Sequence, residues 1–294
     1  MDLHQAQDFV GLLTADDIAS AGYTGAEQAP PPETCRYCGE RLQYSGVVGG
    51  NRVLRWMNFP ERCKCEQAVA FWKDYDEKQA AKEKAERLAE ERKARRERAE
   101  RLVGSNKMKR RFAQRTFKTW VETPENKKAY NAALEYASHF NDRAREGIGL
   151  YIEGPYGTGK THLAAAIANN LMERGIPVIC KTSIAILEDV KGAFDRNEQQ
   201  VLRLYKTIDL LIIDDLGKEQ CTEWSQAVLY GILNERYEDL LPTCITTNFG
   251  EEDLVRQMTL PDGDNSRIRA IISRLHEINV VVSMVWDDYR GRPV

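Results

Sequence analysis

The segment GPYGTGKT, Gly154 to Thr161, constrains the fold of this chain more than any other feature. It fits the pattern G-x-x-x-x-G-K-[ST], in which glycines let the backbone curl so that successive N–H groups face an anion. The apolar run LYIE precedes it and the helical stretch THLAAAIANNL follows it. A helix that begins at Lys160 would direct the positive end of its dipole at the same anion. The sequence therefore predicts a phosphate loop and not an ordinary glycine-rich turn.

The loop and the residue after it are expected to bind a nucleoside triphosphate. These residues are Gly154, Pro155, Tyr156, Gly157, Thr158, Gly159, Lys160, Thr161 and His162. Lys160 is expected to reach the β- and γ-phosphates, and the Thr161 hydroxyl to bind Mg²⁺. No chemistry requires an imidazole at His162, so a packing or supporting role is favoured there.

Apolar runs and helical patterns alternate from residue 107 onward. Strands are expected at 149–153, 177–181, 208–214, 242–246 and 279–285, and helices at 125–145, 160–174, 183–194, 224–239 and 265–276. Short apolar strands separated by helices are typical of an α/β fold whose mostly parallel sheet is covered on both faces. We therefore predict a five-stranded sheet of this kind.

Polar side chains follow two of these predicted strands. IDLLIIDDLG places Asp214 and Asp215 at the carboxyl end of a strand, the edge where ligands bind in open α/β sheets. Asp214 would hold Mg²⁺, and Asp215 would act as a general base or orient water. CITTNFG places Asn248 after another strand, where an amide can orient the attacking water or sense the γ-phosphate. A helix cap or a turn is the alternative for each of them.

Four of the seven cysteines cluster early in the chain, in CRYCGE and RCKCE. They are Cys35, Cys38, Cys63 and Cys65. Four thiolates around Zn²⁺ would supply the folding energy that a small unit without long apolar runs lacks. The Cys-x-Cys spacing of the second pair is less common than Cys-x-x-Cys, so free or redox thiols are the alternative.

Composition divides the chain into four parts. We expect an extension at 1–34, a zinc-binding module at 35–72, a charged helical linker at 73–106 and a nucleotide-binding domain at 107–294. In the extension, Thr14 and Asp17 could form a capping box for a short helix. The linker is rich in Glu, Lys, Arg and Ala with acid-to-base pairs four residues apart, which favours a solvated spacer helix over a coiled coil.

The overall charge limits the possible partners. The formal net charge is -3 at pH 7, with acidic and basic residues nearly balanced, so any contact with nucleic acid must come from a local patch. No apolar run reaches the roughly 18 residues of a membrane-spanning helix, and the start lacks a signal-peptide pattern. We expect a cytoplasmic protein with reduced thiols and no membrane partner.

Four motifs in order, GKTHLAAAIAN, LLIIDDLG, TTN and SRL, resemble the AAA+ ATPases of the DnaC/DnaI helicase-loader group. Transposition-helper ATPases of the IstB type are close relatives of that group. The resemblance covers about residues 111 to 290, from RRFAQRTFKTW to WDDYR. DnaI-type loaders also carry an amino-terminal zinc module that docks on the replicative helicase, whereas IstB-type relatives generally lack one. The cysteines therefore favour a loader, although their Cys-x-Cys pair departs from the loader pattern.

The resemblance implies a role for each motif residue. It gives Walker A roles to Lys160 and Thr161, Walker B roles to Asp214 and Asp215, and the sensor-1 role to Asn248. Arg274, in SRL, matches the arginine finger that completes a neighbouring subunit's site, and Arg290, in DYR, resembles the sensor-2 position. A finger supplied in trans implies that the active form is an oligomer.

The stretch between the second and third predicted strands is a candidate for binding single-stranded DNA. Related initiators carry an extra helical element at this place that grips single-stranded DNA. Here Lys181 and Lys191 offer charge and Phe194 a possible stacking face. The alternative is that Phe194 packs in the core and that both lysines are merely solvated.

These features lead to one main hypothesis and two alternatives. The main one is a Mg²⁺-dependent ATPase that loads the hexameric, DnaB-type replicative helicase onto single-stranded DNA during replication initiation. The first alternative is an IstB-like transposition helper that acts on duplex DNA. The second is an adaptor that ATP switches without being hydrolysed, since Asp215 stands where a longer Glu would serve as the base.

Overall fold

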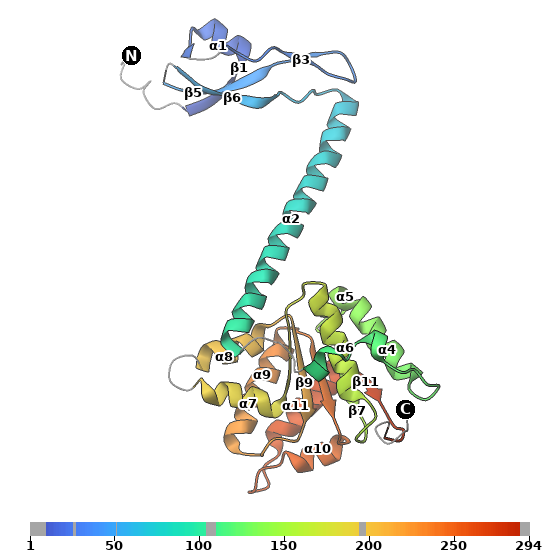
Figure 1. Cartoon of the computed structure of the whole chain (residues 1–294). Coiled ribbons are helices and arrows are strands. Elements are labelled where there is room, and N and C mark those ends of the chain that lie inside the picture. Colours follow the sequence, from blue (N-terminus) through green and yellow to red (C-terminus); the bar gives the residue numbers. More distant parts are fainter. Residues whose placement is uncertain (1–9, 26–27, 51, 104–109, 194–197, 289–294) are drawn as a thin grey trace. The chain divides into compact units, whose positions relative to one another are not determined.

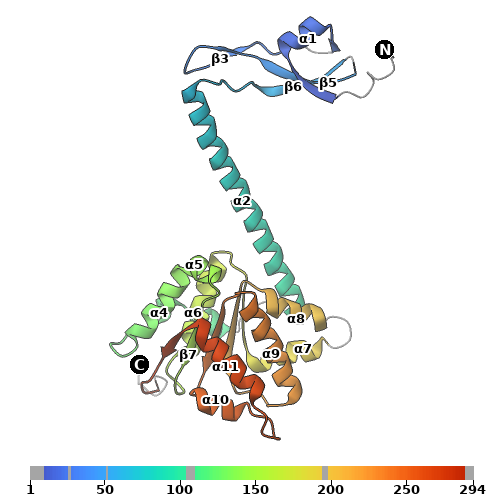
Figure 2. The same cartoon turned by 180° about the vertical axis from the view of Figure 1, so that it is seen from behind.

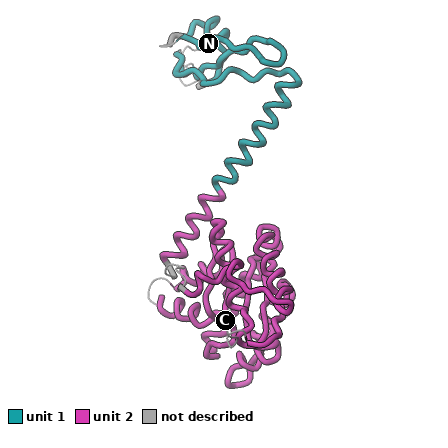
Figure 3. Tube along the Cα trace, turned by 45° about the vertical axis from the view of Figure 1, so that its right-hand side comes forward, with its two compact units in different colours: residues 1–87 teal, residues 88–294 magenta. Residues whose placement is uncertain are grey.

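The computed structural model describes residues 10–25, 28–50, 52–103, 110–193 and 198–288 (Figure 1). The chain separates into two compact units, residues 1–87 and 88–294 (Figure 3). The boundary falls inside one continuous helix, α2 (Glu66–Val103), which begins before the expected linker start at 73. Among the residues described, no helix is both long and apolar enough to cross a membrane.

The first unit contains a sheet that extends beyond the expected module. Its strands are β1 (Val10–Thr14), β5 (Tyr44–Gly49), β6 (Arg52–Pro60) and β2 (Thr24–Gly25), in the order β1-β5-β6-β2. Because β1 pairs with β5, part of the expected extension belongs to the same sheet as the residues around the cysteines. The short helix α1 (Ala15–Ala21) begins at the predicted capping box between Thr14 and Asp17.

The apolar core of the first unit is small. A two-stranded hairpin, β3 (Glu33–Thr34) with β4 (Arg41–Leu42), carries the first cysteine pair at its turn. The buried cluster here consists of Cys35, Cys63 and Ala68, with Leu42, Cys65 and Trp72 packed against it. So little apolar burial agrees with the expectation that this unit needs a further source of stability.

The second half of α2 belongs to the second unit. Ala99 is buried in the core of that unit. Arg95 and Arg92 form ion pairs with Asp209, which precedes the third strand of the main sheet, at 2.8 and 4.0 Å. This part of the helix therefore packs on the nucleotide-binding domain and is not a wholly solvated spacer.

The second unit is built on a five-stranded parallel sheet, as predicted. Its strands are β7 (Gly149–Glu153), β8 (Val178–Thr182), β9 (Leu210–Leu216), β10 (Thr243–Thr247) and β11 (Asn279–Ser283), in the order β11-β7-β10-β9-β8. All pairings between these strands are parallel. Since β9 lies beside β10, the two polar segments that follow these strands meet at one edge of the sheet.

Helices cover both faces of this sheet (Figures 1 and 2). One face packs on α4 (Lys127–Ser138), α5 (Phe140–Arg145) and α6 (Lys160–Glu173). The other packs on α7 (Ser183–Gly192), α8 (Glu198–Thr207), α9 (Glu223–Glu238), α10 (Glu251–Gln257) and α11 (Ser266–Ile278). In β9, Leu210 and Ile212 face the first layer, and Leu211 and Ile213 face the second.

The structure adds elements to the predicted pattern. The expected helix at 125–145 is divided at His139 into α4 and α5. Helices α8 and α10 had not been predicted. A short helix, α3 (Arg110–Ala113), and a 3-10 turn, η1 (Phe117–Thr119), precede α4 and lie against α6.

Candidate nucleotide site and cysteine cluster

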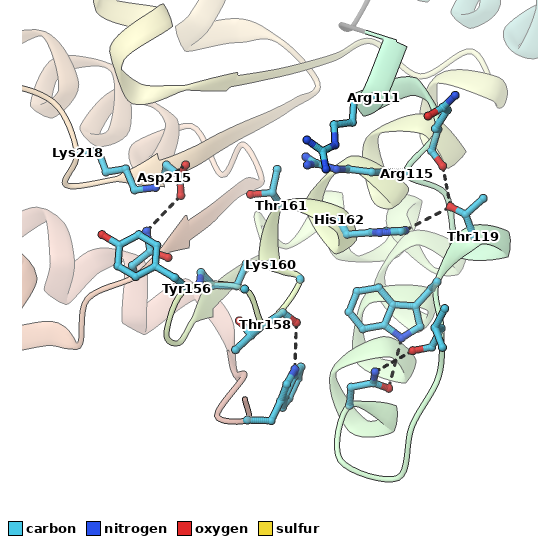
Figure 4. A pocket seen from close by; sticks show the side chains of 18 residues that line it. Arg111, Arg115, Thr119, Tyr156, Thr158, Lys160, Thr161, His162, Asp215 and Lys218 are labelled. Carbon is cyan, nitrogen blue, oxygen red and sulfur yellow. Dashed lines mark hydrogen bonds and ion pairs between the residues drawn. The ribbon is translucent and has the colours of Figure 1, made fainter. Parts of the chain in front are cut away.

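A cavity of about 600 Å³ lies at the carboxyl edge of the main sheet, beside the phosphate loop. The predicted site residues that line it are Tyr156, Gly157, Thr158, Gly159, Lys160, Thr161, His162, Asp215 and Asn248. Figure 4 shows the loop residues on one side of this cavity and Asp215 on another. The fold thus brings together motif residues as far apart in the sequence as Tyr156 and Asn248, which are 92 positions apart.

The loop has the backbone shape that its glycines predict. Gly154, Gly157 and Gly159 all have positive φ, at 143°, 81° and 97°. At Gly159 a Cβ would lie 2.8 Å from the Trp120 ring, and at Gly154 it would lie 2.2 Å from the Met284 carbonyl oxygen. Larger residues are therefore excluded at these two positions by both conformation and space.

Lys160 lies in the concave side of the loop. Its side chain is 4 % exposed, and its Nζ donates hydrogen bonds of 2.7 Å to the carbonyl oxygens of Gly154 and Pro155. A buried ammonium that donates to these carbonyls can gain further from an anion, because hydrogen bonds between two charged groups are stronger. The loop therefore fits a phosphate group.

Asp214 joins three elements of the domain. Its Oδ1 accepts hydrogen bonds from Thr161 Oγ1 on α6, at 3.0 Å, and from Thr246 Oγ1 on β10, at 2.6 Å. The residue is 5 % exposed, and burial raises the pKa of its carboxyl group. Hydroxyl and carboxylate oxygens are the ligands that Mg²⁺ takes from proteins, so Thr161 and Asp214 together fit this ion.

The side chain of Asp215 has different surroundings from that of Asp214, because the pairing between β9 and β10 is irregular at this point. The register between β9 and β10 shifts at Thr246, so Asp214 and Asp215 both lie opposite one residue. Asp215 has a φ of 59°, which is unusual for a residue other than glycine. Its backbone N–H donates to Thr246 Oγ1 at 2.9 Å. This bulge gives two consecutive acidic residues different surroundings.

The carboxylate of Asp215 has two partners at the cavity. Lys218 Nζ lies 2.8 Å from Asp215 Oδ2, and Asn248 Nδ2 donates to Asp215 Oδ1 at 3.3 Å. Asn248 thus lies beside the second aspartate rather than the first. Lys218 also lies over the Tyr156 ring, 5.1 Å from its centre, and had not been identified from the sequence (Figure 4). Its position directly after DDLG was the signal available.

The segment before α4 supplies a second side of the cavity that the sequence reasoning missed. Its lining residues are Arg111, Gln114, Arg115, Thr119, Trp120, Val121 and Asn126. Trp286 also lines the cavity, and its Nε1 donates to the Thr158 carbonyl at 3.1 Å. RRFAQRTFKTW and WDDYR mark the limits of the resemblance, and only Arg290 in the second segment carries a predicted role. The combination of basic and aromatic residues in both was the available signal.

Other predicted residues lie away from this cavity or outside the part described. Arg274, on α11, does not line it, and its Nη1 donates to Asn234 Oδ1 at 2.5 Å and to Tyr230 Oη at 3.2 Å. Lys181 forms an ion pair with Asp189. Lys191 is exposed at the end of α7. Phe194 and Arg290 are not among the described residues.

The four early cysteines converge as the zinc hypothesis requires. Their Sγ atoms all lie within 4.8 Å of one another, with Cys35 to Cys65 at 3.9 Å and Cys38 to Cys63 at 3.4 Å. A tetrahedral zinc site with Zn–S bonds of about 2.3 Å has sulfur–sulfur edges of roughly 3.8 Å. Backbone N–H groups of Tyr37 and Cys38 lower the pKa of Cys35 to about 7, whereas the pKa values of Cys38 and Cys63 are raised among the neighbouring thiols, so it is the sulfur geometry that supports zinc. The cluster therefore fits zinc.

The buried charge of Asp214 leads to a prediction about stability. Because burial raises its pKa in the folded chain, the folded state is weakened as pH rises through that pKa, and the ionised carboxylate costs stability at neutral pH. We expect Asp214→Asn, which keeps an oxygen acceptor for both threonines, to raise the melting temperature by about 2 to 4 °C at pH 7. The gain should shrink as pH falls toward about 4.

Thermal unfolding at pH 7 and at lower pH measures this effect, with Asp142→Asn, exposed on α5, as the control that should leave the melting temperature unchanged. A lower melting temperature in Asp214→Asn at pH 7 would contradict the stated cost of the buried charge.

Comparison with known proteins places the chain among ATP-binding proteins. The chain matches the family described as IstB-like ATP binding protein over residues 64–293. It is 28% identical over 153 residues to the replicative helicase loader DnaI of Bacillus subtilis (strain 168). The aligned residues cover 51% of this chain and 49% of that relative. It is 29% identical over 175 residues to the replicative helicase loader DnaC of Escherichia coli (strain K12), 58% of this chain and 67% of that one. The match thus spans about half the length of DnaI.

Solved structures agree with this placement. A crystal structure of DnaI has a TM-score of 0.52 and 26% identity, covering 62% of this chain and 94% of that chain. The crystal structure of the DnaC helicase loader has a TM-score of 0.52 and 25% identity, covering 60% of this chain and 99% of that chain. The chain therefore belongs to the IstB-like ATP-binding protein family, and its second unit has the AAA+ fold of the DnaC/DnaI type.

Proposed function

We propose that this chain is an ATP-dependent loader that delivers a hexameric, DnaB-type replicative helicase onto single-stranded DNA during replication initiation. The observation that carries the proposal is the meeting of the phosphate loop, Asp215 and Asn248 at one cavity, in a chain similar to two replicative helicase loaders. The family match supports ATP binding, and the paired polar groups around Asp215 support hydrolysis.

Each motif residue has a definite task in this proposal. Lys160 binds the β- and γ-phosphates, and Thr161 with Asp214 holds Mg²⁺, which supplies positive charge where the phosphate negative charge develops. Asp215 accepts a proton from the attacking water, and Asn248 orients that water. The carboxylate and amide are already 3.3 Å apart, so little rearrangement is needed to place a water between them and the phosphate.

Arg274 acts in trans in this proposal. It lies on α11 and does not line the cavity of its own subunit. Its guanidinium is held by Asn234 and Tyr230, both on α9, which fixes its direction before a neighbour arrives. A neighbouring subunit would receive this arginine at its triphosphate, so hydrolysis requires self-assembly, which we place on the helicase.

The trans arrangement predicts complementation between two inactive variants. In the presence of single-stranded DNA and helicase, Arg274→Ala and Asp215→Asn should each reduce ATP hydrolysis by about 10³-fold or more, because one loses the finger and the other the base. An equimolar mixture of the two variants should regain a substantial fraction of the ATP hydrolysis rate of the unchanged chain. In the mixture, subunit interfaces form in which an intact Arg274 of one subunit faces an intact Asp215 of the next. Phosphate release measures this.

The matched control is Arg269→Ala, an exposed arginine of the same helix that pairs with Glu252. It should hydrolyse ATP at the rate of the unchanged chain. A mixture that remains as inactive as its components, at concentrations where the complex with helicase forms, would contradict a finger supplied in trans.

We further propose that the residues around Cys35, Cys38, Cys63 and Cys65 form a zinc-binding module that docks on the helicase. The proposed division of the chain keeps this module at 35–72, the linker at 73–106 and the ATPase domain at 107–294, with residues 1–34 before them. The distances between the four sulfur atoms support zinc binding. The resemblance to DnaI-type loaders supports docking of this module on the helicase.

Zinc content tests the module directly. We expect about one zinc per chain, measured by atomic emission, and a loss of most of it in Cys38→Ser, because three thiolates bind far less tightly than four. Cys221→Ser is the control, since this thiol donates to the Met258 carbonyl and lies outside the cluster. A full zinc content in Cys38→Ser, or none in the unchanged chain, would sink the proposal.

Single-stranded DNA would contact the segment that begins at Lys181. Because Lys181 already pairs with Asp189, the exposed Lys191 is the better placed of the two lysines. The family match also includes IstB in its description, which favours a transposition helper as the second candidate. Tighter binding of duplex than of single-stranded DNA, with no binding of helicase, would support that candidate instead.

A further inference from the structure

Two arginines in the nucleotide cavity have no role in the motifs. Arg111 and Arg115 both line the cavity, and Figure 4 shows both side chains on the side of Thr161. Neither guanidinium has a carboxylate within ion-pair distance among the residues that the structure describes. Arginine forks match the oxygens of phosphates, and two of them without carboxylate partners beside a phosphate loop form a site for anions.

The helix of the phosphate loop holds the backbone that carries these arginines. Asn169 Nδ2, on α6, donates to the carbonyl oxygens of Arg115, at 2.9 Å, and Phe112, at 3.3 Å. His162 Nε2 lies 3.0 Å from the Thr116 carbonyl oxygen, and since a carbonyl only accepts, this nitrogen carries the hydrogen. His162 and Asn169 are two helical turns apart and so lie on one face of α6. One rigid element thus places Lys160, Thr161 and the backbone of Arg115.

We propose that Arg111 and Arg115 bind phosphate oxygens of the nucleotide held in the same subunit, with His162 and Asn169 as the residues that position them. The inference rests on the proposed use of the cavity for ATP. It gives the site a basic group in cis, on the side of Thr161, in addition to Lys160 and to the arginine supplied in trans.

Nucleotide affinities test the role of the arginines. The full chain is titrated with ATP, ADP, AMP and adenosine, each displacing a fluorescent ADP analogue. We expect Arg115→Gln to weaken ATP binding by about 10- to 100-fold, because charged hydrogen bonds are lost, and to change adenosine binding by less than about twofold. Arg111→Gln, at an exposed residue, should cause a smaller loss of the same kind and serves alone if Arg115→Gln does not fold.

The control is Arg145→Gln on α5, whose guanidinium pairs with Asp142 of its own helix and does not line the cavity. It should bind all four compounds like the unchanged chain. An unchanged ATP affinity in both Arg115→Gln and Arg111→Gln would overturn the proposal. An equal loss for ATP and adenosine would also overturn it, since the guanidinium would then contact the base.

Lys160→Ala separates this inference from the proposed function. If Lys160→Ala binds ATP like the unchanged chain, the nucleotide site itself is misassigned. If Lys160→Ala loses ATP binding and neither arginine variant does, only the cis role of the arginines fails.

The positioning role has its own readout. As a single substitution, Asn169→Ala should weaken ATP binding. When it is added to Arg115→Gln, it should change ATP affinity by less than about twofold, because the two substitutions remove the same interaction. If the losses of ATP-binding free energy in the two single variants simply add in the double variant, while the melting temperatures are unchanged, the positioning role is overturned.

Discussion

The buried carboxylate of Asp214 is the interaction on which the nucleotide site depends. Its Oδ1 accepts hydrogen bonds from hydroxyl groups of α6 and β10 while the residue itself lies within β9, so one oxygen atom links three elements. A buried charge is costly unless it is well satisfied, and here two hydroxyls lie within 3.0 Å. The arrangement explains why the start of α6, with Lys160, lies over the same sheet edge as Asp215 and Asn248.

A single bulge then separates two adjacent acidic residues. Asp214 stays between the threonines, whereas Asp215, with its positive φ, faces the cavity and meets Lys218 and Asn248. Strained backbone of this kind persists where surrounding contacts enforce it, and the hydrogen bond from its N–H to Thr246 is such a contact. Threonine at 246 therefore serves both residues, which the sequence pattern TTN does not reveal by itself.

The main sheet and its motifs could be predicted because their signals are local. The first four residues of β9, Leu210 to Ile213, are all apolar and alternate between the two helix layers, and the phosphate loop combines a fixed spacing with the strand and helix around it. The sheet of the first unit was missed because β5 and β6 mix glycines and charged residues, and their partner β1 lies far away in the sequence. The basic and aromatic composition of the segment with Arg111 and Arg115 does not by itself place it at the cavity, because the hydrogen bonds that hold its backbone come from Asn169, more than 50 residues away.

The proposed loading of a helicase depends on both the ATP site and the cysteine module of this chain. The most direct measurement is the number of helicase hexamers loaded on circular single-stranded DNA, counted after removal of unbound protein, with and without this chain and ATP. The number of loaded hexamers should rise only when the chain and ATP are both present, and this rise should be lost in Lys160→Ala. An equal number of loaded hexamers without the chain, or an unchanged rise with Lys160→Ala, would contradict the proposed loading.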